Sequence, residues 1–114
     1  MKRLFTRDEI QAILETNLLN ADVSYMDREN KGSPDNVIIF YRQPTAPIRG
    51  DDTIHIQKAS IQVNHYHKKK LDSIEKLMLE NFSCEPYLFA VKQLDTDYWG
   101  TYYVFYIFIP ESGW

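Results

Sequence analysis

Two histidines, His65 and His67, are the residues whose type and spacing come closest to a chemical site. They lie two positions apart in I-Q-V-N-H-Y-H, and alternate residues of a β-strand point to the same face. Two imidazoles placed in this way can bind one transition-metal ion, which needs at least a third protein ligand. His55 falls in the opposite phase, and the nearby Asp72 is expected on a helix. The pattern therefore favours a polar strand end over a metal centre, and we expect no metal and no cofactor.

Two other groups could carry chemistry. The run from His65 to Lys70 (H-Y-H-K-K-K) combines basic side chains with an aromatic ring, as do sites for phosphate or single-stranded nucleic acid. The net charge of −3 and the neighbouring Asp72 favour a solvated turn instead, so we expect no specific nucleic-acid partner. Cys84, the single cysteine, lies in F-S-C-E-P, which resembles a helix end and carries no motif of a nucleophile. We therefore expect a protein that is not an enzyme.

Composition sets the class of the protein. The 114 residues fit one domain, and 44% apolar with 25% charged residues is typical of globular proteins. The longest apolar run, Tyr102 to Ile109, is far shorter than the roughly 20 residues that a membrane helix needs. We expect a soluble single-domain protein made in the cytoplasm, with no membrane partner.

The first helix has a clear start. Thr6 and Glu9 have the spacing of a capping box, in which each side chain accepts a hydrogen bond from the backbone N–H of the other. Phe5 and Ile10 flank the box at the positions of a hydrophobic staple. These signals predict a helix from Arg7 to about Leu19, with an apolar face of Ile10, Ile13, Leu14 and Leu18.

Short strands and two long loops are expected next. Val23 to Met26 is a strand candidate, and Asp27 to Asn36 is entirely polar apart from Gly32 and Pro34, which indicates a solvated loop. Val37 to Tyr41 is apolar at every position, which predicts a strand covered on both faces. Gln43 to Asp52 is expected to be a second loop, in which Pro44, Pro47 and Gly50 prevent regular structure.

The stretch from Thr53 to His67 predicts one long strand. In its second half Ile61, Val63 and His65 share one face, which we expect to be covered, while Ser60, Gln62 and Asn64 share a wet face. Ile54 and Ile56 are in the opposite phase to Ile61, so one extra residue, a β-bulge, is expected near Lys58–Ala59.

A helix is expected from Leu71 to Phe82, ending before Pro86, because its apolar residues follow helical spacing. Lys68, Lys69 and Lys70 either start this helix, against its dipole, or form a turn before an Asp72 cap with Glu75 as its partner.

Two strands close the chain, Tyr87–Leu94 and Thr101–Ile109, joined by a hairpin loop of D-T-D-Y-W-G. The order α-β-β-β-α-β-β predicts a two-layer α+β fold, with a mostly antiparallel sheet of about five strands and two helices on one face. The last strand is apolar on both faces. Its outer face is therefore expected either to be covered by a partner subunit or to be exposed to water, with the tyrosine hydroxyls making that exposure tolerable.

Taken together, these features resemble the tail-terminator or tail-completion proteins of long-tailed bacteriophages and prophages. The resemblance covers nearly the whole chain and rests on the order of its parts. A capped helix and a short strand precede V-I-I-F-Y-R, which leads into a Pro-rich loop with P-I-R-G-D-D. The strand I-Q-V-N-H-Y-H, the helical L-D-S-I-E-K-L-M-L-E-N-F and a hairpin follow.

The resemblance implies a structural subunit without catalysis or cofactor, which caps the tail tube as a ring, hexameric when assembled, and helps join tail to head. Its partners would be other copies, the tail-tube protein and the head–tail connector proteins, first in the bacterial host cytoplasm and then in the tail or neck of the virion. By position it assigns subunit and tube contacts to Asp27–Asn36 and Arg42–Asp52. The expected contact residues are Arg42, Arg49, Asp51, Asp52, Tyr102, Tyr106 and Phe108.

Two alternatives remain open at this point. One is a head-completion or minor capsid protein of the same size and setting. The other is a small metal-binding or enzymatic module built on His65 and His67.

Overall fold

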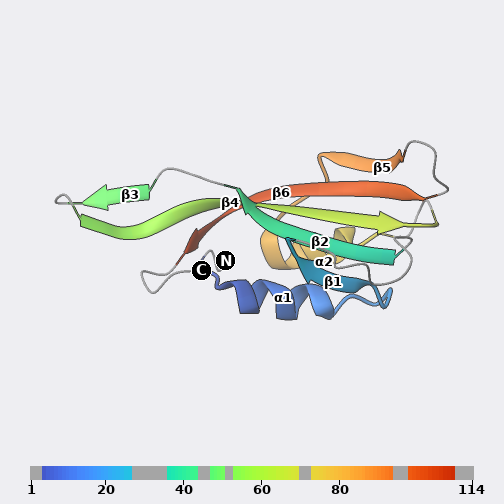
Figure 1. Ribbon diagram of the computed structural model, residues 1–114, viewed down its shortest axis with the longest axis horizontal. Helices are drawn as coiled ribbons and strands as arrows, with labels where there is room; N and C mark the ends of the chain where they lie inside the picture. Colours follow the sequence, from blue (N-terminus) through green and yellow to red (C-terminus); the bar gives the residue numbers. More distant parts are fainter. Residues whose placement is uncertain are drawn as a thin grey trace.

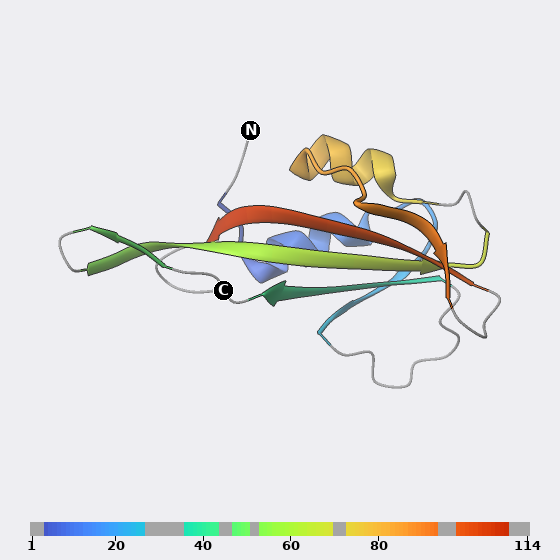
Figure 2. The same ribbon diagram turned by 90° about the horizontal axis from the view of Figure 1, so that it is seen from above.

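The computed structural model describes residues 4–26, 36–43, 47–50, 53–69, 73–93 and 98–109, with the backbone alone for 47–50 and 53–57. Two helices lie on one face of a mostly antiparallel sheet, which confirms the predicted α+β class (Figures 1 and 2). The elements are α1 (Arg7–Glu15), β1 (Asp22–Tyr25), β2 (Asn36–Gln43), β3 (Pro47–Gly50), β4 (Thr53–His67), α2 (Glu75–Phe82), β5 (Leu88–Lys92) and β6 (Trp99–Ile109).

The sheet has β4 at its centre. Its strand order is β1-β2-β4-β6-β5, with β3 pairing to the first part of β4. Every pair is antiparallel except β1 with β2, which run parallel. None of the described helices is long and apolar enough to cross a membrane.

The predicted capping box of α1 is present. The Glu9 N–H donates to Thr6 Oγ1 at 3.2 Å, and the Thr6 N–H donates to Glu9 Oε1 at 3.1 Å. The helix ends at Glu15, before the predicted Leu19, because the buried Asn17 side chain bonds the backbone on both sides of the turn. Leu18 is therefore 97% exposed and does not belong to the apolar face, which was a wrong prediction.

The second helix starts later than predicted, at Glu75 after the N-cap residue Ile74. The prediction that it begins at Leu71 is therefore wrong, and Lys68 and Lys69 lie in a bend directly after β4. Lys70, Leu71 and Asp72, with the proposed Asp72 cap, lie outside the described residues. The helix packs through Met78 and Phe82.

The core lies between the helices and the sheet. Phe82 stacks on Phe105 with ring centroids 4.3 Å apart, and Phe5 meets the edge of Phe82 at 5.3 Å. From Thr101 to Ile109 the odd-numbered residues of β6 are buried on this face, while the even-numbered ones are half-buried or exposed on the other. The sheet contributes to this core Ile38, Phe40, Ile61, Val63, Tyr103, Phe105, Ile107 and Ile109.

The region predicted as the second loop contains a strand. Pro47–Gly50 forms β3 and pairs with the start of β4, so the prediction of irregular structure throughout Gln43–Asp52 is wrong. A proline fits at the first residue of an edge strand, because its missing N–H is not needed there. The β3–β4 hairpin projects beyond the rest of the sheet (Figures 1 and 2), and the molecule is elongated, 52 × 28 × 23 Å.

The predicted bulge exists but lies elsewhere. Between β3 and β4 the register shifts so that Ile48 pairs with Ile56 and Arg49 with Ile54, which leaves His55 as the extra residue. The register of β4 with β6 is continuous through Lys58 and Ala59, where the bulge was expected.

The described ends of the chain meet at β6. Leu4 forms a parallel bridge with Phe108, and the Phe5 N–H donates to the Phe108 carbonyl at 3.0 Å. Most of the predicted loop Asp27–Asn36 lies outside the described residues. Asn36 itself opens β2 and donates through Nδ2 to the Leu19 carbonyl at 2.7 Å.

Candidate functional site

The most distinctive surface is the face of the sheet that the helices leave uncovered, which we call the open face. The registers of β2, β4 and β6 bring its side chains together in three adjacent strands. It carries Ile39, Tyr41, Ser60, Gln62, Asn64, Tyr66, Tyr102, Val104, Tyr106 and Phe108.

Tyrosines dominate the open face. The Tyr66 ring meets the edges of Tyr98 and Tyr102 at centroid distances of 6.0 and 6.1 Å, and Tyr87 lies 6.3 Å from Tyr102. Burial raises the pKa of Tyr66 to about 12, and Tyr102 beside it adds to the shift. The Tyr66 phenol therefore stays neutral at physiological pH. Tyrosine combines a large apolar ring with a hydrogen-bonding end, which suits a surface that alternates between water and a partner.

Two of the three polar side chains expected on a wet face of β4, Ser60 and Gln62, are buried, so the prediction is wrong for them, while Asn64 is half-buried. Ser60 and Gln62 are each only 5% exposed, because β4 is the central strand and its neighbours' side chains cover it. Gln62 Nε2 donates to Asn64 Oδ1 at 2.7 Å and to Tyr87 Oη at 3.0 Å. Ser60 Oγ donates to Gln43 Oε1 at 3.1 Å. These bonds tie the aromatic side chains to the strand beneath them.

Exposed apolar side chains gather beside the open face, at β5. Tyr87, Leu88, Phe89 and Val91 are 55, 46, 42 and 39% exposed, and Tyr106 on the adjacent β6 is 55% exposed. An edge strand with this many exposed apolar side chains is unusual for a protein that stays alone, since such edges are normally protected by charges. The β5 edge and the open face together form one candidate interaction surface.

Of the predicted contact residues, Tyr102, Tyr106 and Phe108 lie together on the open face. Lys58 Nζ lies over the Tyr106 ring, 4.9 Å from its centroid, and supplies a cation there. Arg42 pairs in register with Ile61, which places it on the opposite, helix-covered face and not beside Tyr106 as expected. Arg49 lies on β3, and Asp51 and Asp52 lie outside the described residues.

The histidine pair lies under the helices. His65 and His67 share one face as predicted, both are buried, and their ring centroids are 4.7 Å apart. Both ring nitrogens of His67 are engaged: Nδ1 donates to the Lys69 carbonyl at 2.8 Å, and Nε2 lies 2.7 Å from Thr101 Oγ1. Thr101 Oγ1 also accepts from the Ala90 N–H at 3.1 Å. His67 therefore joins the end of β4 to β5 and β6.

His65 is different, because both of its ring nitrogens are buried and find no hydrogen-bond partner among the described residues. The Tyr103 hydroxyl, on the same face of β6, is also buried, and within the described part of the chain its geometry meets no hydrogen-bond partner, although Ser73 lies near enough to offset part of the rise in its pKa that burial causes. Burial lowers the pKa of His65 to about 3, with His67 adding a smaller effect. Burial likewise raises the pKa of Tyr103, and the negative charge of Glu75 adds to the shift. Among the described residues no three His, Cys, Asp or Glu side chains are placed to hold a metal ion.

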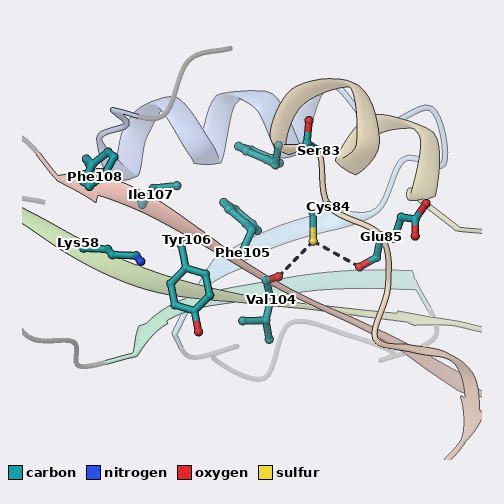
Figure 3. Close-up of a pocket in the computed structure, with 10 residues that line it drawn as sticks. Lys58, Ser83, Cys84, Glu85, Val104, Phe105, Tyr106, Ile107 and Phe108 are labelled. Carbon is teal, nitrogen blue, oxygen red and sulfur yellow. Dashed lines mark hydrogen bonds between the residues drawn. The ribbon is translucent and has the colours of Figure 1, made fainter.

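Cys84 is buried at the end of α2. Its thiol donates to the Val104 carbonyl at 3.3 Å and to the Glu85 carbonyl at 3.5 Å (Figure 3). This arrangement holds the chain after α2 against β6. A nucleophile–base pair at Cys84 would need a histidine beside the thiol, and both described histidine side chains, His65 and His67, lie in the other cluster.

Sequence reasoning identified the tyrosines of β6 but missed the partners that complete the surface, above all Tyr66, Tyr87 and Gln62. Tyr66 and Gln62 could have been found because they lie an even number of residues apart on β4 and therefore share one face. That face had been interpreted as solvated. No protein-family model matches this sequence, and no curated protein or solved structure matches it either.

Proposed function

We propose that this chain is a structural subunit of a bacteriophage or prophage tail, which caps the tail tube and helps join the tail to the head. In this proposal it works as a ring of identical copies, hexameric when assembled, and contacts the tail-tube and connector proteins. The proposal starts from the resemblance in the order of helices and strands. The observation that carries it further is the uncovered sheet face with its adjoining apolar edge.

The physical argument concerns what a two-layer fold leaves exposed. Both helices cover the same face of the sheet, and Tyr106, Phe89 and Leu88 remain 55, 42 and 46% exposed. Interfaces are enriched in aromatic side chains and depleted of charge at their centres, as this surface is. Adding a second copy or a tube subunit here would bury apolar area at roughly 25 cal/mol per Å².

The test is co-assembly with tail tubes formed by the major tail protein of the same phage or prophage. Wild-type protein should co-sediment with the tubes and appear at their ends by electron microscopy. Phe89→Glu and Tyr106→Glu should abolish this binding, because each places a charge at the centre of the surface. Leu18→Glu is the matched control, since Leu18 is exposed on the helix side and should tolerate the change.

The two neighbouring acidic residues that are expected to make contacts, Asp51 and Asp52, have their own test. Asp51→Lys combined with Asp52→Lys should weaken tube binding while the far-UV circular dichroism spectrum stays that of the wild type. Wild-type protein that never binds the tubes would refute the proposed function. Binding that survives Phe89→Glu and Tyr106→Glu would remove the open face from it.

A further inference from the structure

One stretch of β6 has an outer edge along which no described strand lies. The even-numbered residues of β6 direct their backbone N–H and C=O groups away from β4. The Tyr102 carbonyl accepts a hydrogen bond from the Tyr87 N–H at 3.0 Å. In the same way the Phe108 carbonyl accepts from the Phe5 N–H, also at 3.0 Å. Since backbone direction alternates along a strand, Val104 and Tyr106 point the same way. Pairing with β5 stops at Tyr102, and the bridge to Leu4 begins only at Phe108.

No strand of the described residues fills the gap between these two neighbours. The Val104 carbonyl receives the Cys84 thiol, but within the described part of the chain neither the N–H nor the C=O of Tyr106 has a partner. From Val104 to Phe108 the gap spans about 13 Å between two occupied ends, and Tyr106 at its middle offers the outward N–H and C=O. We call this stretch the β6 gap.

A cleft of about 420 Å³ lies along the β6 gap (Figure 3). Phe82, Phe105 and Ile107 line it from the core side, and Tyr106 and Lys58 line it from the open face. An extended segment in this cleft could exchange backbone hydrogen bonds with Tyr106 and place alternate side chains on the apolar wall. This is the geometry of β-strand addition, in which main-chain bonds give affinity and side-chain pockets give specificity.

The other outer strand on this side of the sheet is a poorer acceptor. β5 carries a register break between Leu88 and Val91, where Ala90 adopts a left-handed backbone with φ of 51°. A bulge of this kind interrupts the row of donors and acceptors along an edge and protects it from pairing. The β6 gap has no such break, because β6 keeps a continuous register with β4.

The same molecule presents a strand of matching length. β3 pairs with β4 on one side only, and no described strand lies along its other side. Its four residues, Pro47–Gly50, also span about 13 Å. The extra residue of the nearby bulge belongs to β4, so β3 itself is unbroken. The hairpin projects beyond the end of the sheet, where it can reach a neighbouring molecule (Figures 1 and 2).

We propose that β3 of a second copy of this chain adds to the β6 gap, so that each subunit donates its hairpin to one neighbour and accepts the hairpin of another. Such a head-to-tail contact closes into a ring when the rotation per subunit allows it. The proposal rests on the proposed function, for which it names the contact between ring subunits.

The first test compares two substitutions of Tyr106. Proline at this position removes the outward N–H and leaves the ladder with β4 intact, because the N–H of Tyr106 points away from β4. Tyr106→Ala loses the same ring but keeps the N–H. In light scattering over a concentration series, Tyr106→Ala should self-associate more strongly than Tyr106→Pro, with the circular dichroism spectrum confirming that both are folded. Equal association of the two folded variants would overturn the proposal.

The second test captures the contact as a disulfide in a Cys84→Ala background. One variant carries Tyr106→Cys, and two others carry Ile48→Cys or Arg49→Cys, since neighbouring strand residues face opposite sides. Mixing the Tyr106→Cys chain with one of the two hairpin variants should give a cross-linked dimer, whereas each variant alone should give none. A cross-link in Tyr106→Cys alone, in a hairpin variant alone, or in none of the mixtures would overturn the proposal.

These outcomes separate the inference from the proposed function. Tube binding by wild type without any hairpin-to-gap cross-link would reject the hairpin contact and leave the tail-cap function standing. Cross-linked rings that never bind tail tubes would reject the function and leave the contact standing. A cross-link from the Tyr106→Cys chain to the tube protein, and not to a second copy, would show that the tube protein occupies the β6 gap. That result would overturn the inference.

Discussion

Acid should destabilise this protein through a single side chain, His65. The imidazole is buried beneath the helices with neither ring nitrogen hydrogen-bonded, so the charged form has nothing to replace its water. Burial, and to a smaller extent the neighbouring His67, lowers the pKa of His65 from 6.5 to about 3. The folded chain therefore resists a proton that the unfolded chain binds readily. Stability is complete above pH 6.5 and is lost as the pH falls from 6.5 towards 3.

The size of the effect follows from proton linkage. Each pH unit inside this window changes the free energy of unfolding by about 1.4 kcal/mol for one fully shifted group. Between pH 7.5 and pH 4.5 the expected loss through His65 is on the order of 3 kcal/mol, because only the part below its unfolded pKa of 6.5 counts. Against a typical total of about 5–15 kcal/mol, this one residue would remove a substantial part of the stability.

Urea unfolding at pH 7.5 and pH 4.5, followed by circular dichroism, measures the loss, and His65→Leu provides the control. Protonation of carboxylates lowers the stability of both proteins, so the difference between them isolates His65. The wild type should lose on the order of 3 kcal/mol more than His65→Leu on acidification. At pH 7.5 the variant should match the wild type or exceed it by about 1 kcal/mol, since it removes two unbonded polar atoms. Equal losses on acidification would show that His65 is hydrated or partnered, and would refute the reasoning.

Three further predictions concern the capping box, Thr101 and metal content. Thr6→Ala and Glu9→Ala should each lower the free energy of unfolding by about 1 kcal/mol. The double variant should lose less than the sum of the two, because both side chains belong to one reciprocal pair of hydrogen bonds. Additive losses, measured by urea unfolding, would contradict the capping box. Thr101→Val should cost about 2 kcal/mol, since the hydroxyl serves both His67 and Ala90, whereas Thr101→Ser should unfold near the wild-type urea midpoint. Elemental analysis should find no stoichiometric zinc or nickel, because His67 has no ring nitrogen to spare; one ion per chain would instead favour the metal module.

The features that the sequence predicted correctly are those whose causes are local. The Thr6–Glu9 box involves residues three apart, so its chemistry is complete within one helical turn. The alternation along β6 showed that its odd residues, such as Phe105, would be buried. From that alternation and the order of elements the two-layer fold followed.

The errors arise where distant parts of the chain decide the outcome. Ser60 and Gln62 alternate as a solvated face would, yet they are buried because β2 and β6 flank β4, and no local pattern reveals a strand's neighbours. Pro47–Gly50 is a strand only through its pairing with β4. The helix after Asn17 stops early because one buried side chain bonds the turn.

The same distinction explains the candidate surface. Tyr102, Tyr106 and Phe108 were placed on one face by their spacing alone, and the structure keeps them together. Arg42 was expected to contribute to the same contact because the resemblance assigns contacts to Arg42–Asp52. Its position depends on the register of β2 against β4, which sets Arg42 opposite Ile61 on the other face.

The contact of Phe5 with Phe108 has a consequence for how the chain folds. The first helix reaches its final place only after the last strand has formed, so the decisive contacts join residues from opposite ends of the chain. Topologies of this kind have high contact order and fold slowly, in milliseconds to seconds, because a large loop must close before its contacts contribute. During synthesis, β4 stays unpaired on one side until the eleven residues of β6 have left the ribosome. A lower growth temperature, which weakens hydrophobic association of the unpaired strand, should therefore raise the yield of folded protein more than a stabilising substitution in α1.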